Sequence, residues 1–227
     1  MIPDPRRSQD GREAVSSSRL FNQHVPLLNG ERSAVVVVDL QNDFCHPDGV
    51  FARAMQMRIP DVAGLVAAIN RLVGAARAAG ADVVWARMIW DGDEDVGVLA
   101  RGGFLAHEGL RRGTWGVELL DGLDVAEGDL FVAKKRFSAF YRTNFEELLR
   151  ARDVGCLYAA GVRTDYCVES TVRDAFFRDY HVVVARECVA GYFPLLHGNS
   201  LLGMGTLFAE VVDLDAALQR LGTAPGS

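Results

Sequence analysis

Short apolar runs alternate along the chain with longer segments in which apolar residues recur at helical spacing. The first run, Ala34 to Val38, is nearly all valine, which is typical of a parallel strand buried on both faces. Similar runs predict six strands, at Ala34–Val38, Asp82–Met88, Leu130–Ala133, Leu157–Ala160, His181–Ala185 and Phe208–Val212. Helical spacing predicts helices at Val62–Ala79, Asn144–Arg152, Thr164–Tyr180, Leu195–Leu207 and Asp213–Leu221.

This alternation of strands and helices predicts right-handed βαβ units and therefore a parallel sheet with helices on both faces. The fold class is α/β: a Rossmann-like three-layer α/β/α arrangement with a six-stranded parallel sheet, for which we take the strand order 3-2-1-4-5-6. We expect one domain at residues 31–222, an N-terminal extension at 1–30 and a C-terminal tail at 223–227. The longest irregular stretch, Trp90 to Val117, is predicted to cover the substrate.

The composition is that of a globular protein: 49% of the 227 residues are hydrophobic and charges of both signs are spread along the chain. A net charge of −6 offers no basic face for nucleic acid. No apolar run reaches membrane-spanning length, and the first residues do not read as a secretory signal. The four cysteines show no CxxC pairing. We therefore expect a cytoplasmic protein that acts on a small molecule, with neither nucleic acid nor membrane as a partner.

Three reactive side chains fall at the ends of predicted strands. Asp39 ends the first strand, Lys134 follows the third, and Cys167 follows the fourth at the start of a helix. In the assumed strand order the first and fourth strands are neighbours, so Asp39 and Cys167 meet at the point where the order reverses. The helix dipole is expected to lower the pKa of the thiol. Taken singly, these residues are more often a turn aspartate, a surface lysine and a buried structural cysteine; their shared position favours a nucleophilic site.

Three segments carry a resemblance to a known family: Asp-Leu-Gln-Asn-Asp-Phe at 39–44, Lys-Lys-Arg-Phe-Ser-Ala-Phe at 134–140 and Gly-Val-Arg-Thr-Asp-Tyr-Cys-Val-Glu at 161–169. In this order and spacing they resemble the isochorismatase-like cysteine hydrolase superfamily. The resemblance implies a catalytic triad of Asp39, Lys134 and Cys167. It also implies a cis peptide between Val162 and Arg163, and an oxyanion hole formed by the backbone N–H groups of Arg163 and Cys167. The implied reaction passes through a thioester and needs no metal or organic cofactor.

The branches of this superfamily differ at residues that the sequence displays. Isochorismatases lack the nucleophilic cysteine, so Cys167 counts against that activity. Nicotinamidases carry metal-binding histidines, whereas this chain offers His46, followed by Asp48, and a distant His107. The stretch Cys167 to Phe177, with Gly-Thr-Trp-Gly at 113–116, is more similar to ureidoacrylate, biuret and N-carbamoylsarcosine hydrolases.

The predicted function is therefore that of a cysteine-nucleophile amidohydrolase that cleaves a C–N bond of a small amide, ureido or carbamoyl compound. Four alternatives stay open: an amide or lactam hydrolase acting on a basic natural product, a nicotinamidase, an isochorismatase, and a non-catalytic binding member. The basic substrate is suggested by the acidic stretch at 91–95, should it line the pocket. A nucleotide-binding protein is disfavoured because no GxGxxG follows the first strand.

Aromatic and amide side chains near the three segments are candidate substrate-binding groups. The aromatic candidates are Phe44, Trp90 and Trp115, and the amides that would orient the substrate or Asp39 are Gln41 and Asn42. Arg163 stands where a small residue is frequent in the related hydrolases, and its side chain reaches either a substrate carboxylate or solvent. The resemblance also implies a homodimer or homotetramer, for which the apolar stretch Leu201 to Val212 is a candidate interface.

Overall fold

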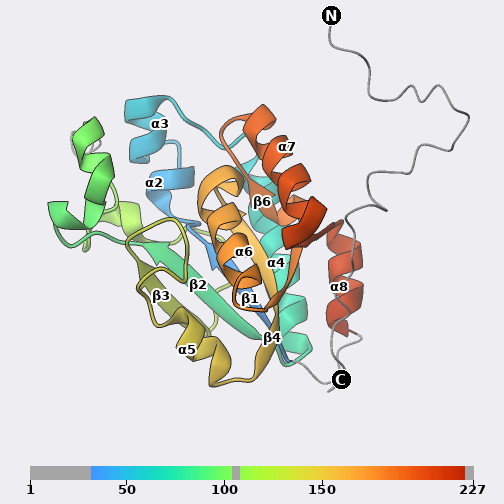
Figure 1. The fold of residues 1–227 in the computed structure, drawn as a ribbon. Coiled ribbons are helices and arrows are strands. Elements are labelled where there is room, and N and C mark those ends of the chain that lie inside the picture. The colour runs from blue at the N-terminus through green and yellow to red at the C-terminus, as the bar shows by residue number, and fades with distance from the viewer. Residues whose placement is uncertain (1–31, 104–107, 223–227) are drawn as a thin grey trace, which may run out of the picture.

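The computed structural model describes residues 32–103 and 108–222, which form a parallel sheet covered by helices on both faces (Figure 1). The strands in this part of the chain are β1 (Arg32–Val38), β2 (Asp82–Met88), β3 (Leu130–Lys134), β4 (Val154–Val162), β5 (His181–Ala185), β6 (Val189–Ala190) and β7 (Glu210–Val212). Their order is β3-β2-β1-β4-β5-β7, with the two-residue β6 pairing with β4. The predicted α/β fold and strand order are confirmed, because β7 is the sixth predicted strand. The predicted extension at 1–30 and tail at 223–227 lie outside the described residues.

Right-handed crossovers place the helices on opposite faces of this sheet. The described helices are α2 (Asn42–Cys45), α3 (Val50–Met55), α4 (Val62–Ala78), α5 (Phe145–Arg150), α6 (Glu169–Phe176), α7 (Pro194–Gly203) and α8 (Leu214–Gly222). Helix α4 connects β1 to β2 in one direction, whereas α6 connects β4 to β5 in the other, so crossovers of one hand put them on opposite sides (Figure 1). None of these helices is long and apolar enough to cross a membrane.

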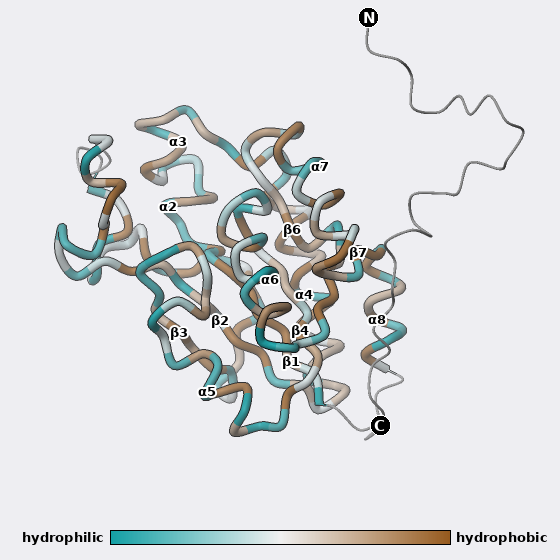
Figure 2. The backbone as a smooth tube through the Cα atoms, in the orientation of Figure 1, coloured by the Kyte–Doolittle hydropathy of each residue, from teal (hydrophilic) through white to brown (hydrophobic). Residues whose placement is uncertain are grey.

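The core lies around β1 and β4, the two strands at the middle of the sheet. Ala34 to Val38 are at most 1% exposed, as their uninterrupted apolar run predicts. In Figure 2 the hydrophobic segments gather in these central strands. Val38 pairs with Gly161, whose φ is +113° and where a Cβ atom would collide with the backbone of Val38. Glycine thus lets the ends of β1 and β4 approach closely, which brings together the segments that follow them.

The chain departs from the predicted elements mainly around these strand ends. The helix expected at Thr164–Tyr180 begins with a π-helical turn at Thr164–Val168, in which Val168 N donates to Arg163 O at 3.1 Å, and its regular part ends at Phe176. Two short helices, α2 and α3, follow β1 without having been predicted, since four to six residues give no readable periodicity.

The stretch Trp90 to Val117 folds partly into 3₁₀ helices at Asp93–Gly102 and Trp115–Val117. Trp90 N donates to Leu110 O at 2.8 Å, which holds the chain at Leu110 next to the residues that follow β2. The predicted interface segment Leu201 to Val212 carries exposed apolar side chains at Leu202 and Leu207. A homodimer or homotetramer stays a prediction.

Candidate active site

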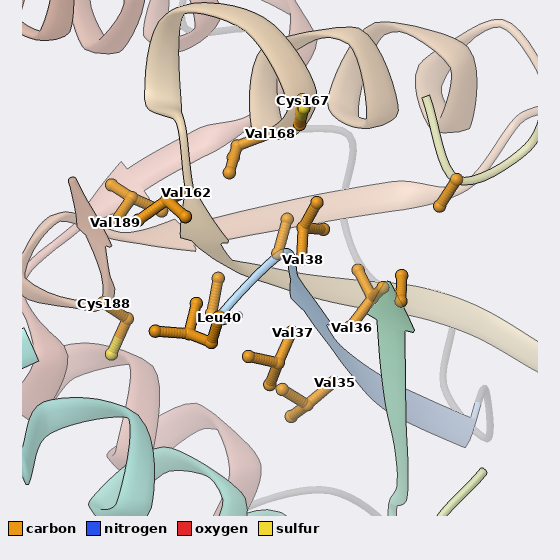
Figure 3. Close-up of a cluster of buried hydrophobic side chains, with 14 of the residues drawn as sticks. Val35, Val36, Val37, Val38, Leu40, Val162, Cys167, Val168, Cys188 and Val189 are labelled. Carbon is orange, nitrogen blue, oxygen red and sulfur yellow. The ribbon is translucent and has the colours of Figure 1, made fainter. Parts of the chain in front are cut away.

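Asp39, Lys134 and Cys167 converge at the carboxyl edge of the sheet. Asp39 directly follows β1, Lys134 is the last residue of β3, and Cys167 lies in the turn after β4. Lys134 reaches across β2, so that its Nζ donates to Asp39 Oδ2 at 2.6 Å. The exposed fractions are 0% for Asp39, 0% for Lys134 and 3% for Cys167. Figure 3 shows Cys167 on the helical turn beyond β4, on the side of the sheet where Val38 ends β1.

The Asp39 carboxyl lies between a cation and a thiol. Its backbone has φ of +54°, a conformation that aspartate tolerates better than most residues, and this turns the chain sharply at the end of β1. Lys134 also donates to Arg136 O at 3.2 Å, so the ammonium is fixed at two points. The Cys167 thiol lies close enough to the carboxyl to lower its pKa, and Asp39 Oδ1 has no hydrogen-bond partner in the part of the chain that the structure describes. Burial raises the pKa of Asp39, and Lys134 opposes that rise.

The pKa of the Cys167 thiol is raised, whereas the sequence predicted that a helix dipole would lower it. Burial is the main cause, the negative charge on Asp39 is the second, and Lys134 opposes both. The prediction was wrong because it considered the helix start alone: Cys167 belongs to the π-helical turn before α6 and is enclosed by protein. In the resting protein the sulfur therefore keeps its proton, and Asp39 is placed to accept it.

A backbone amide is aimed at the sulfur. The peptide bond between Val162 and Arg163 is cis, as the resemblance implies. The backbone N–H of Arg163 lies close enough to the sulfur of Cys167 to favour its charged form. A donor at this position can also stabilise negative charge on an oxygen bonded to a carbon that the sulfur attacks.

A cavity of about 100 Å³ opens onto the thiol. Besides Cys167, it is lined by Phe44, Phe51, Met88, Trp90, Leu99, Leu110, Phe137, Arg163 and Tyr166. Two of the predicted substrate-binding residues, Phe44 and Trp90, are in this set. Trp115 is not in this set. It is 52% exposed, and its ring packs on that of His46 in a T-shaped arrangement, with 4.9 Å between the ring centroids. The apolar wall suits a small organic molecule, and a volume of about 100 Å³ leaves room for only a very small one.

The side chains of Gln41 and Asn42, both predicted to be near the substrate, hydrogen-bond to backbone groups around the site. Gln41 Nε2 donates to Met88 O at 3.0 Å and to Val117 O at 2.9 Å, while its Oε1 accepts from Met88 N at 2.8 Å. Asn42 Nδ2 donates to Trp115 O at 2.9 Å. Gln41 is fully buried and its amide hydrogens are both in use, so it orients the loop that follows β2 and does not reach a substrate.

Replacing Gln41 with alanine is expected to lower the free energy of unfolding by about 2–4 kcal/mol, because three buried backbone groups lose their partner. Chemical denaturation of the two proteins measures this difference. Asn70→Ala is the matched control: its amide also bonds to two backbone groups, Gly122 O and Asp124 N, but on the surface. If Asn70→Ala lowered the free energy of unfolding as much as Gln41→Ala does, this account would be contradicted.

Several lining residues were missed by the sequence analysis, namely Phe51, Met88, Leu99, Leu110, Phe137 and Tyr166. Phe137 stacks on Tyr166 in the cavity wall, with 5.2 Å between the two ring centroids. Leu99 and Leu110 belong to the stretch predicted to cover the substrate, which supplies them together with Trp90. The only signal for Leu99 and Leu110 in the sequence was their position in this stretch. An apolar residue that lines a cavity cannot be distinguished by sequence from one in the core.

The acidic stretch at 91–95 is not among the residues lining this cavity. Three of its four carboxylates form ion pairs with basic neighbours: Asp91 with Arg112 and Lys135, Asp93 with Arg111, and Asp95 with Lys135. The argument for a basic substrate rested on unpaired acidic charge at the site, so it loses its basis. The pairs with Lys135 hold the loop onto the segment that follows Lys134, and those with Arg111 and Arg112 lie within the stretch from Trp90 to Val117.

Of the two histidines considered as metal ligands, only His46 lies within the described residues. His46 Nδ1 accepts from Asp48 N at 3.1 Å, and its ring packs on Trp115. His107 lies outside the described residues. Within 32–103 and 108–222, no three His, Cys, Asp or Glu side chains are grouped as a metal ion requires.

Comparison with known proteins assigns the family. The Isochorismatase domain matches residues 33–216. The chain belongs to the isochorismatase family. It is 33% identical over 204 residues to a ureidoacrylate amidohydrolase of Methylobacterium radiotolerans, covering 83% of this chain and 79% of that protein.

Solved structures agree with this assignment. A cysteine hydrolase from Pseudomonas syringae pv. phaseolicola has a TM-score of 0.77 at 30% identity, over 86% of this chain and 95% of that chain. An N-carbamoylsarcosine amidase from Thermoplasma acidophilum has a TM-score of 0.65 at 27% identity, over 81% and 97% of the two chains. The family predicted from the three sequence segments is confirmed.

Proposed function

We propose that this protein is a cysteine-nucleophile amidohydrolase that hydrolyses a C–N bond of a small ureido or carbamoyl compound through a thioester. The observation that carries the proposal is the buried Cys167 thiol, held against Asp39 and Lys134 at the base of a small apolar cavity. The names of the relatives, a ureidoacrylate amidohydrolase and an N-carbamoylsarcosine amidase, support a hydrolase of C–N bonds.

The first half of the reaction forms the acyl-enzyme. Asp39 takes the proton of Cys167, and the thiolate attacks the ureido carbonyl carbon. The raised pKa of both groups matches this transfer, since each holds a proton more readily than usual in the buried site. The N–H groups of Arg163 and Cys167 stabilise the resulting oxyanion. Asp39 then returns the proton to the departing nitrogen, and the amine leaves.

The second half restores the enzyme. A water molecule, deprotonated by Asp39, attacks the carbonyl carbon of the thioester and the Cys167 sulfur leaves with the proton. For a ureido substrate the enzyme-bound group is a carbamoyl group, and its release gives carbamate. Lys134 keeps the charge of Asp39 balanced throughout, because its ammonium stays within 2.6 Å of the carboxylate.

The test is release of ammonia or amine from a panel of ureido acids, N-carbamoyl amino acids, biuret, nicotinamide and basic lactams. We expect turnover of the ureido or carbamoyl compounds, with kcat/KM at least tenfold above that for nicotinamide or the lactams. Turnover confined to nicotinamide or to a lactam would contradict the proposed substrate class. Turnover of no compound, with a Cys167 that does not alkylate, would contradict the hydrolase itself.

A further inference from the structure

The hydroxyl of Thr171 joins the two segments that carry Cys167 and Lys134. Thr171 lies on α6, four residues after Cys167, and is fully buried. Its Oγ1 donates to Cys167 O at 2.7 Å and accepts from Ala139 N at 3.0 Å. The first bond stays within the helical turn of the nucleophile, whereas the second reaches the segment that follows β3. One hydroxyl therefore bridges the backbones of both segments.

The bond from Ala139 is the unusual one of the two. A threonine hydroxyl often bonds to the carbonyl four residues earlier in its own helix, so the bond to Cys167 O alone describes a common local geometry. Ala139, by contrast, lies 32 residues before Thr171 along the chain and is fully buried. Its N–H needs an acceptor inside the protein, which a valine of the same shape at position 171 would not supply. The contact therefore requires a hydroxyl at this position.

The bridged segments carry groups whose separation decides whether a proton can pass between them. Lys134 begins one segment, and its Nζ bonds to Asp39 Oδ2 at 2.6 Å. Cys167 belongs to the other and lies in a π-helical turn, a rare geometry that is found mainly as single turns at functional sites. A shift of the turn against the lysine segment changes the position of the sulfur relative to Asp39, which takes its proton.

The same two segments meet a second time in the cavity wall, where Phe137 stacks on Tyr166. Tyr166 is 44% exposed, and stacked rings can slide over each other at little cost. The two bonds of the Thr171 hydroxyl are buried and each needs a short distance and a defined direction. The hydroxyl therefore constrains the relative position of the segments more sharply than the ring stack does.

We propose that Thr171 is a positioning residue for the reaction: its hydroxyl fixes the Cys167 turn against the Lys134 segment. This rests on the proposed cysteine chemistry and deepens it. Thr171 is not among the described residues that line the cavity, so it acts through the two segments and not on the substrate. A displacement of about 1 Å at a reacting group can cost on the order of 100-fold in rate. Loss of the bridge should therefore affect the chemical step more than substrate binding.

The first test separates the hydroxyl from the shape of the side chain. Thr171→Val removes both bonds, and kcat for the ureido compound that the wild type turns over fastest should fall by on the order of 10- to 100-fold, with KM within about threefold. Thr171→Ser restores the hydroxyl and should bring kcat back to within about fivefold of the wild type. Thr171→Ala, which cannot crowd the site, takes the place of a valine variant that does not fold. An unchanged kcat without the hydroxyl, or a serine variant as slow as the valine one, would overturn the proposal.

Thr143→Val is the matched control. The hydroxyl of Thr143 also bonds to two backbone groups, Ala139 O and Phe145 N, but both lie in the segment that leads from Lys134 into α5. Its removal should lower the free energy of unfolding and leave kcat within about fivefold of the wild type. If the two valine variants lost kcat equally, lost stability would explain the effect and the bridge would have no role of its own.

Alkylation of Cys167 gives a measurement that needs no turnover. Iodoacetamide forms an S–C bond with loss of iodide, and in this account the thiol proton passes to Asp39. The second-order rate at neutral pH should fall by about tenfold or more in Thr171→Val and recover in Thr171→Ser, with peptide mapping to assign the modified cysteine. Equal rates in the three proteins would refute the positioning role even where ureido turnover is found. A lowered and rescued rate without ureido turnover by the wild type would uphold that role and contradict the proposed function.

Discussion

Replacing Cys167 with alanine is expected to reduce turnover by on the order of 10⁵-fold or to below detection, with the fold retained. The sulfur is the only atom in the proposed reaction that bonds to the substrate, so no other group replaces it. The side chain is small and lies at the cavity floor, so its loss removes little packing. Amine release at saturating substrate measures the rate, and circular dichroism checks the fold.

Cys188→Ala is the matched control for this experiment. Cys188 is also fully buried, but it lies beside β6, away from the residues that line the cavity. Its replacement should leave kcat within about threefold of the wild type. Comparable activity in Cys167→Ala and the wild type would rule out Cys167 as the nucleophile.

Replacing Lys134 with methionine is expected to lower kcat/KM by on the order of 10²- to 10⁴-fold. The ammonium is completely buried and bonds to Asp39 at 2.6 Å, so its loss leaves a buried carboxylate without its counter-charge. Asp39 would then be protonated over a wider pH range, and a protonated carboxyl cannot accept the proton of Cys167. Because burial already raises the pKa of Asp39 against the effect of Lys134, the variant shifts it further in the same direction.

Lys135, the residue next to Lys134, is the matched control for this prediction. Lys135 pairs with Asp91 and Asp95 at the surface loop and contributes nothing to the Asp39 carboxyl. Lys135→Met should leave kcat within about fivefold of the wild type, since exposed ion pairs contribute little. Kinetics of the two methionine variants, measured side by side, decide the matter: the reverse pattern would mean that Lys135 is the functional lysine.

The sheet was predictable because its central strands, β1 and β4, are buried on both faces. The valine run at 34–38 reads as a parallel strand in any context that covers it, and the triad positions follow from placing three reactive residues at strand ends. The strand order then required only that β1 and β4 be neighbours. Even the two-residue β6, which was missed, changes none of these positions.

The direction of individual side chains was not predictable in the same way. Gln41 follows Asp39 by two residues, yet its amide turns to Met88 and Val117, which come from other parts of the chain. The Arg163 side chain was left between substrate and solvent, and only its contacts with Tyr166, Tyr192 and Asp165 fix its guanidinium. Tertiary contacts of this kind leave no local pattern in a sequence.

The direction of the Cys167 pKa shift could not be predicted from the sequence either. The helix start was visible in the sequence and favours a thiolate, but the enclosure of the sulfur and its contact with Asp39 outweigh that effect. In the proposed mechanism the nucleophile is therefore a neutral thiol that becomes reactive only when Asp39 accepts its proton. Activation by a neighbouring base is therefore central to the account.

Mass spectrometry of the acid-quenched reaction with 3-ureidoacrylate tests covalent catalysis most directly. The account predicts a carbamoyl group on the peptide that contains Cys167, formed at least as fast as the amine is released and absent from Cys167→Ser. Release of the amine during a single turnover, with Cys167 unmodified at every quench time and activity surviving its complete alkylation, would contradict the account.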